Sequence, residues 1–148
     1  MLQDSLKLKG RVGIVLNDKD GNVIDTQHVE NLVVNDGLNF ICSRMKDTTQ
    51  DAMSNMAVGS NATAVAGGDT TLGTELARVT MTSTTVSTNT IEYVATFPAG
   101  TGTGALVEAG IFNAASAGDM LCHVTYAVIN KAAADSMTIT WTITLTAS

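Results

Sequence analysis

The most regular pattern in the chain is a strict alternation between residues 137 and 146. Apolar side chains occupy the odd positions and threonines the even ones: Met137, Ile139, Trp141, Ile143 and Leu145 against Thr138, Thr140, Thr142, Thr144 and Thr146. A period of two is typical of an antiparallel strand with one buried face. We therefore predict that Trp141 points into a core and that the threonines face either solvent or a hydrogen-bonding interface.

Less regular versions of this pattern predict the other strands. Asp20-Gly21 marks a tight turn after the first of them. The predicted strands are 6–16, 23–34, 53–59, 79–87, 90–97 and the two arms of a central hairpin at 106–126. Loops are expected at 61–70, 98–104 and 130–135, where small residues and glycines interrupt the apolar pattern.

One stretch has helical periodicity instead. Leu38, Ile41, Cys42 and Met45 fall at i, i+3, i+4 and i+7, which predicts an apolar stripe lying on the sheet. Asn35 or Asp36 can cap this helix, which runs to about Lys46. A single helical turn is also expected at 71–78.

These elements predict the fold class. About eight strands with turn signals every 8–12 residues or so are typical of an antiparallel β-sandwich or jelly roll. With one short helix near 36–46 and no internal linker, residues 1–148 are predicted to form a single domain.

Composition removes several classes of function. The net charge is −6, and the only local group of basic residues is Lys7, Lys9 and Arg11, so binding of a nucleic-acid backbone is not expected. No apolar run is long enough to span a membrane, and the N-terminus lacks the pattern of a signal peptide. Cys42 and Cys122 lie in apolar runs, which favours two buried free thiols and leaves a disulfide open.

Candidate chemistry is sparse. The glycines at 100, 102 and 104 precede a strand and lack the Lys-Ser/Thr of a phosphate loop, so we interpret them as a flexible connection. His28 and His123 have no metal-ligand spacing around them, and the acidic turn at 17–22 fails the register of a calcium loop. No Gly-x-Ser-x-Gly elbow or cysteine signature is present. We therefore predict no catalysis, no cofactor and no metal.

Glu108 is the one charged group inside an apolar run. A carboxylate in that position must face solvent, find a partner or remain buried at a large desolvation cost. Arg78 is the predicted partner, with a solvent-facing Glu108 as the alternative. Glu75 and Arg78, three residues apart, can form an ion pair of their own. We expect structural roles for Glu75, Arg78, Glu108 and Trp141.

The same residues carry a resemblance to a known group of proteins. The order Gly59, Thr71-Leu72, Glu75, Arg78, Phe97, Glu108-Ala109-Gly110-Ile111-Phe112, Met120-Leu121 is similar to small β-sandwich virion structural proteins of tailed bacteriophages. These include capsid cement or decoration proteins and the collar domains of tail fibres. The segment 31–38 and the strand containing Trp141 also match that group.

The resemblance implies a non-enzymatic role in the virion. Tail-fibre proteins of this group usually carry the domain at the start of a much longer chain, whereas this sequence ends after its last predicted strand. We therefore expect a cement protein that binds the outer capsid shell and stabilises it. A neck, collar or tail-fibre/baseplate adaptor is the alternative. The implied partners are the major capsid protein or other virion proteins, and copies of the chain itself in a dimer or trimer. Assembly would take place in the cytoplasm of the bacterial host.

Overall fold

The computed structural model describes residues 4–46 and 50–147, and within these ranges it contains nine strands and one helix. In chain order the elements are β1 (Leu6–Asn17), β2 (Val23–Val33), α1 (Asn35–Lys46), β3 (Asn55–Gly59), β4 (Glu75–Thr80), β5 (Ser83–Ser87), β6 (Thr90–Phe97), β7 (Gly104–Phe112), β8 (Met120–Lys131) and β9 (Ser136–Ala147). The predictions of a mainly β antiparallel fold and of a helix near 36–46 are confirmed.

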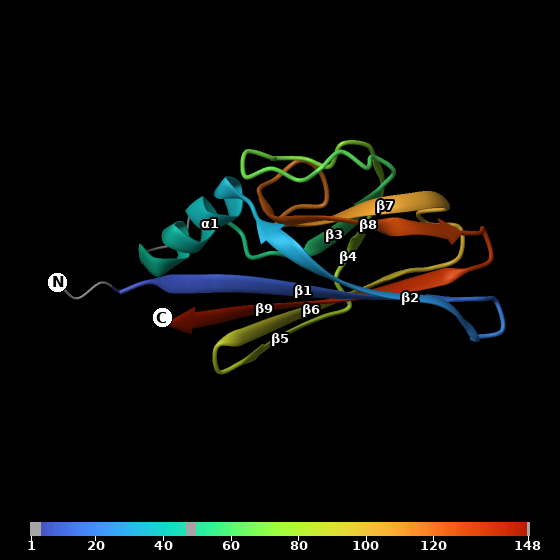
Figure 1. Cartoon of the computed structure of the whole chain (residues 1–148), viewed down its shortest axis with the longest axis horizontal. Coiled ribbons are helices and arrows are strands. Elements are labelled where there is room, and N and C mark those ends of the chain that lie inside the picture. The colour runs from blue at the N-terminus through green and yellow to red at the C-terminus, as the bar shows by residue number, and fades with distance from the viewer. Residues whose placement is uncertain (1–3, 47–49, 148) are drawn as a thin grey trace.

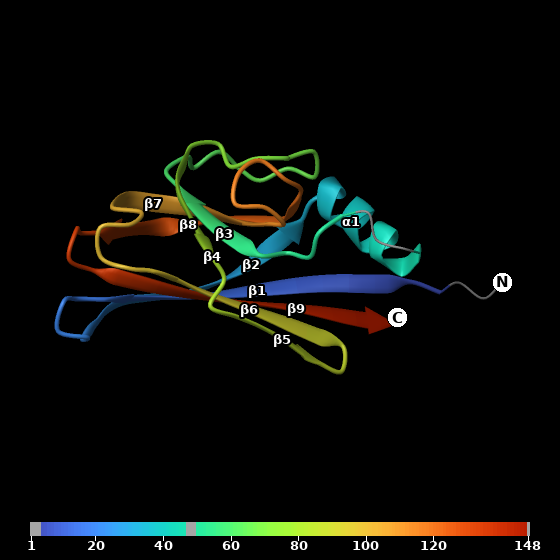
Figure 2. The same ribbon diagram turned by 180° about the vertical axis from the view of Figure 1, so that it is seen from behind.

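All nine strands belong to one hydrogen-bonded sheet in the order β4-β3-β7-β8-β2-β1-β9-β6-β5. The sheet bends at β2, which pairs with β1 along most of its length but with β8 only through Leu32 and Val33. Figures 1 and 2 show the result: β3, β4, β7 and β8 lie over β1, β9, β6 and β5. The sheet is therefore curled, with its two halves facing each other.

The two edge strands of this sheet are consecutive in the chain. β4 and β5 stand at opposite ends of the strand order, yet only Met81 and Thr82 separate them. The Met81 N–H donates to the carbonyl of Ser54 at 2.9 Å, and the Thr82 N–H donates to the carbonyl of Val94 at 2.7 Å. These two bonds hold the edges near each other, so the curled sheet closes much of the way towards a barrel.

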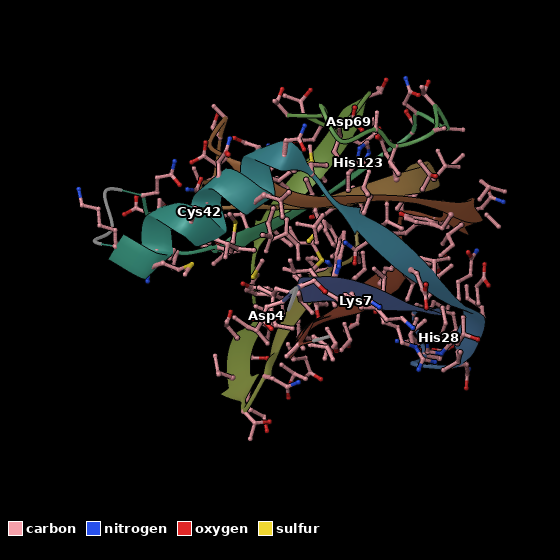
Figure 3. All side chains as sticks on the ribbon, turned by 60° about the vertical axis from the view of Figure 1, so that its left-hand side comes forward. Asp4, Lys7, His28, Cys42, Asp69 and His123 are labelled. Atoms are coloured by element: carbon pink, nitrogen blue, oxygen red, sulfur yellow. The ribbon has the colours of Figure 1, made fainter. Side chains whose placement is uncertain are left out.

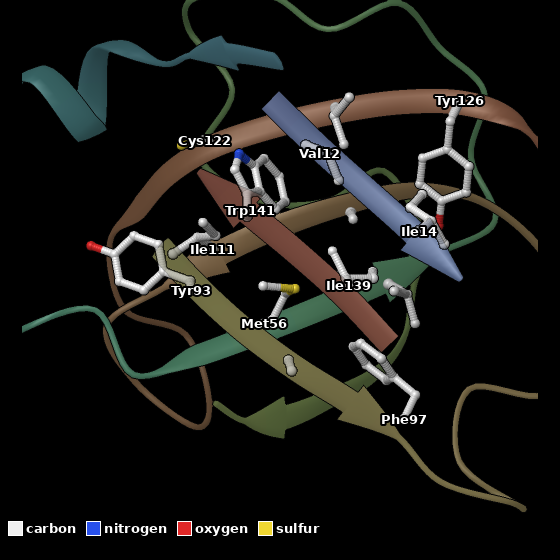
Figure 4. Packing of buried hydrophobic residues seen from close by; sticks show 14 of the residues in the cluster. Val12, Ile14, Met56, Tyr93, Phe97, Ile111, Cys122, Tyr126, Ile139 and Trp141 are labelled. Atoms are coloured by element: carbon white, nitrogen blue, oxygen red, sulfur yellow. The ribbon is translucent and has the colours of Figure 1, made fainter. Parts of the chain in front are cut away.

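One core fills the space between the two halves. Its fully buried members come from strands of both halves, and Figure 4 shows several of them around Trp141. Trp141 is 0 % exposed, and its indole N–H donates to Oδ1 of Asn31 at 2.9 Å. A buried indole normally finds such a partner, because an unpaired N–H in the core is costly.

The expected turn of helix at 71–78 is wrong. Residues 60–74 form a long connection, and Glu75 begins β4 instead. The connection is held to the sheet by contacts from distant strands, described below. Local sequence cannot encode such contacts, which explains the incorrect prediction.

The apolar stripe predicted for α1 does not lie on the sheet as expected. The helix packs through Gly37 and Phe40, while Leu38 is 41 % and Met45 82 % exposed. Gly37 lies directly against the carbonyl of Leu121, where any Cβ would collide with that oxygen. This contact fixes which face of the helix is buried: of the predicted stripe only Ile41 packs against the core, while Leu38, Cys42 and Met45 are left outside.

The start of α1 also differs from expectation. Instead of capping its own helix, the Asp36 carboxylate accepts the Met120 N–H at 2.9 Å, and the Asn35 N–H donates to the carbonyl of Gly67 at 2.7 Å.

The two cysteines differ in burial, although both were expected to be buried. Cys42 is exposed and only Cys122 is buried; both are free thiols. In the described residues no helix has the length and apolar character needed to cross a membrane.

Candidate functional site

Glu108 on β7 is 1 % exposed and lies under the connection formed by residues 60–74. Its Oε1 accepts the backbone N–H groups of Thr74 at 2.8 Å and Asn61 at 3.2 Å, and its Oε2 accepts the N–H of Gly73 at 2.9 Å. Hydrogen bonds to an ionised acceptor are the strong ones. Glu108 therefore holds both ends of this connection.

His123 on β8 extends the arrangement. Its Nε2 lies 3.0 Å from Oε2 of Glu108, and its Nδ1 lies 2.8 Å from Oδ2 of Asp69. Each ring nitrogen of His123 therefore faces a carboxylate oxygen within hydrogen-bond distance. We call Glu108, His123 and Asp69 the loop lock. Figure 3 shows Asp69 and His123 side by side at the top of the molecule.

Electrostatics at Asp69 favour the charged form. The pKa of the Asp69 carboxyl is held below its usual value, first because it accepts the Ala66 N–H at 2.9 Å and also because of its contact with His123. A hydrogen bond that exists only with the anion lowers a carboxyl pKa. Asp69 thus bends the tip of the connection through Ala66 and ties it to the sheet through His123.

The register of the strands explains why these groups meet. Ala57 pairs with Gly110 and Gly110 pairs with His123, so all three share the sheet face opposite the main core. Glu108, two residues before Gly110, lies on the same face. At Gly59, opposite Glu108, a Cβ would collide with the Thr74 carbonyl and would lie 2.5 Å from Oε1 of Glu108. Glycine at position 59 is what allows the connection to approach.

A second, smaller apolar cluster lies on this outer face of the sheet. It contains Val34, Ala57, Leu72, Phe112 and Met120. Leu72 belongs to the connection and is 5 % exposed, so it covers the cluster from above. The connection is therefore held by the apolar side chain of Leu72 and by the hydrogen bonds of the loop lock.

A pocket of about 420 Å³ opens between the connection and the loop lock. Its lining residues are Asn61, Thr63, Ala64, Gly68, Asp69, Thr70, Thr71, Leu72, Gly73, Glu108 and His123. His123 engages a carboxylate with each ring nitrogen, which leaves neither nitrogen to activate a hydroxyl as a general base. Within the described residues, no group of three or more His, Cys, Asp or Glu side chains could hold a metal ion.

Arg78 is not the partner of Glu108, contrary to the prediction. Its guanidinium forms a two-pronged pair with Glu75, at 2.7 and 3.1 Å, which is the ion pair expected from their spacing. It also donates to the carbonyls of Ala114 and Ala117 and stacks on the Phe112 ring, 3.8 Å from the centroid. Arg78 therefore holds the loop at 113–119, next to the connection held by Glu108.

The sequence identified Glu108 but not the rest of the loop lock. In the sequence, His123 is a histidine without metal-ligand spacing around it, and Asp69 lies in an expected loop of small residues and glycines. Their proximity depends on the register between β7 and β8 and on the path of the connection. The only local signal is an ionisable residue, His123, inside the apolar run of the neighbouring strand.

Comparison of the chain with family models, with curated proteins and with solved structures finds no match.

Proposed function

We propose that this chain is a non-enzymatic structural protein of a tailed-bacteriophage virion, and specifically a cement protein that binds the outer capsid shell and stabilises it. The observation that carries the proposal is the use of buried ionisable groups to hold exposed loops. Glu108 and His123 are 1 % and 4 % exposed, and their contacts go to the backbone and to Asp69 of the connection at 60–74. Arg78 holds the second loop.

The residues that carry the phage resemblance are largely those of this framework. Glu108 holds the connection, Gly59 and Gly110 leave space for it, and Leu72, Phe112 and Met120 form the cluster beneath it. In this chain, the residues that carry the resemblance are therefore residues that fix two neighbouring loops. Fixed, exposed loops without an activated nucleophile suit a protein that docks onto a large partner.

The outer face of β9 adds support. Thr138, Thr140, Thr142 and Thr144 are half-buried, and the Thr138 hydroxyl lies 3.1 Å from that of Thr96 on β6. Threonine hydroxyls can donate and accept without the desolvation cost of a full charge. Such a face can be covered by another protein at a low desolvation cost.

We also propose that the curled sheet is best classed as a β-sandwich, with the halves on either side of β2 as its two layers.

The test is the position and copy number of the chain in intact particles of its source virus. Electron cryo-microscopy, together with quantitative mass spectrometry against the major capsid protein, should give hundreds of copies on the shell. Six or twelve copies at the neck or tail would overturn the cement role in favour of the adaptor role. Absence of the chain from purified particles would overturn both.

A matched pair of variants tests whether the connection at 60–74 contacts the shell. Replacing Thr63, an exposed residue of the connection, by Arg should reduce incorporation into particles if this loop contacts the shell. Replacing Thr26, on β2, by Arg serves as the control and should leave incorporation unchanged. Equal incorporation of both variants would contradict contact through the connection.

A further inference from the structure

The outward stripe of α1 is an apolar surface that the fold leaves unused. Leu38, Cys42 and Met45 follow one another at i, i+4 and i+7, and all three are exposed. We call these three residues the α1 stripe. Figure 3 labels Cys42 on this helix, at the end of the molecule away from the β1–β2 hairpin.

The apolar surface continues from Met45 into a groove of about 280 Å³ between the helix and the sheet. Leu8, Ile91 and Leu145 line its sheet side, and the register places Leu8 opposite Leu145 and Ile91 opposite Ile143. These side chains lie on the inner face of the sheet and pack against the edge of the core, where they are only partly buried. A stripe that borders a groove is a larger apolar area than scattered surface residues normally form.

We propose that the α1 stripe is the contact through which two copies of this chain form a dimer, with their α1 helices packed antiparallel. This proposal does not depend on the virion role. A two-fold contact must be self-complementary, and an antiparallel pair of identical stripes meets this condition. Leu38 of each copy then packs on Met45 of the other, and the two Cys42 residues lie next to each other at the axis.

The charges of the helix favour an antiparallel pair over a parallel one. α1 carries Asp36 in its first turn and Arg44 and Lys46 in its last turn. An antiparallel pair brings the basic end of each helix to the acidic end of its partner and also opposes the two helix dipoles. A parallel pair would place like charges together at both ends.

Sedimentation velocity over a range of protein concentrations tests the proposal. The full chain should show a concentration-dependent dimer, and Met45→Glu should shift the equilibrium at least tenfold towards monomer, because it places charge in an apolar contact. Val23→Glu is the matched control: Val23 is 59 % exposed but lies on the β1–β2 hairpin at the other end of the molecule. It should leave dimerisation unchanged.

Cys42 provides an independent geometric readout. Mild oxidation should produce a covalent dimer on a non-reducing gel, since the two Cys42 residues face each other across the proposed axis. Cys42→Ser and Met45→Glu should each abolish that species, with folding checked by circular dichroism. Lys46→Glu should weaken the dimer most at low salt, where it meets the partner's acidic helix end.

Three results would overturn the proposal. The first is a monomer at the highest concentration reached, which would leave the stripe to a different protein. The second is a dimer that Met45→Glu and Val23→Glu weaken equally. The third is a dimer that forms without any Cys42 crosslink, which would place the contact elsewhere.

Discussion

Replacing Glu108 by Gln should destabilise the fold strongly although it changes shape very little. The carboxylate accepts three backbone N–H groups and lies 3.0 Å from Nε2 of His123. An amide has only one oxygen, so its NH2 group faces either the N–H groups of Thr74 and Asn61 or the N–H group of Gly73. His123 also loses its buried partner.

The magnitude follows from that geometry. A hydrogen bond to a charged group contributes about 1.5–3 kcal/mol, and a buried donor left without an acceptor costs about 1–3 kcal/mol. These contributions overlap, so we expect a loss of about 3–5 kcal/mol. Glu108 is 1 % exposed, which means that solvent screening does not reduce this figure. Against a typical stability of about 5–15 kcal/mol, the loss is large.

Urea unfolding followed by Trp141 fluorescence measures the effect, because Trp141 is the only tryptophan and is 0 % exposed. Glu92→Gln, the same change at an exposed position on β6, is the control and should stay within about 0.5 kcal/mol. Amide hydrogen exchange at Gly73 and Thr74 should accelerate in the Glu108 variant alone. A loss below about 1 kcal/mol with unchanged exchange at both amides would refute the role assigned to Glu108.

Three further predictions concern the same framework. Gly59→Ala should cost at least about 1–3 kcal/mol in urea unfolding, since its Cβ would collide with the Thr74 carbonyl; a neutral effect would contradict the close approach. Asp69 has a lowered pKa, so its contribution is present above the unfolded value near 3.8 and is lost as the pH falls through the lower folded value. Asp69→Asn should therefore lower the melting temperature at neutral pH, with the difference from the parent protein closing in acid; a constant difference down to pH 2 or so would count against it. Burial raises the pKa of the Cys122 thiol, so mass spectrometry after alkylation should find only the exposed Cys42 modified in the native chain, and rapid labelling of Cys122 would be inconsistent with its burial.

Local periodicity was sufficient to predict most of the strands and the extent of α1. The strict alternation at 137–146 predicted β9 because one face of that strand meets the core along nearly its whole length. The helix was located correctly, but its buried face was not. That face is set by Gly37 against the Leu121 carbonyl, a contact between residues far apart in sequence.

The loop lock marks the limit of such reasoning. A carboxylate inside an apolar run signals an unusual partner, but the sequence offers no means to choose between Arg78 and His123. The choice depends on the register of β7 against β8 and on an irregular connection that carries Asp69 over the sheet. Neither feature has a periodic signature in the sequence, which is why the prediction of Arg78 as the partner of Glu108 was wrong. The structural role predicted for Glu108 stays a prediction, which its replacement by Gln tests.

The loop lock and the α1 stripe are connected through contacts at the start of α1. The lock fixes the connection at 60–74, and Gly67 in that connection accepts the Asn35 N–H at 2.7 Å, at the first residue of α1. On the other side, β8 carries His123 of the lock and also Leu121, whose carbonyl meets Gly37 and accepts the Val34 N–H at 3.2 Å. The start of α1 is thus held from two directions by elements that the loop lock positions. The lock therefore helps to fix the start of α1, and through it the direction in which the α1 stripe points. This link gives a physical reason for placing ionisable groups in a buried position: they fix the exposed loops and the exposed helix face relative to each other, which the proposed contacts with a capsid shell and with a second copy would both require.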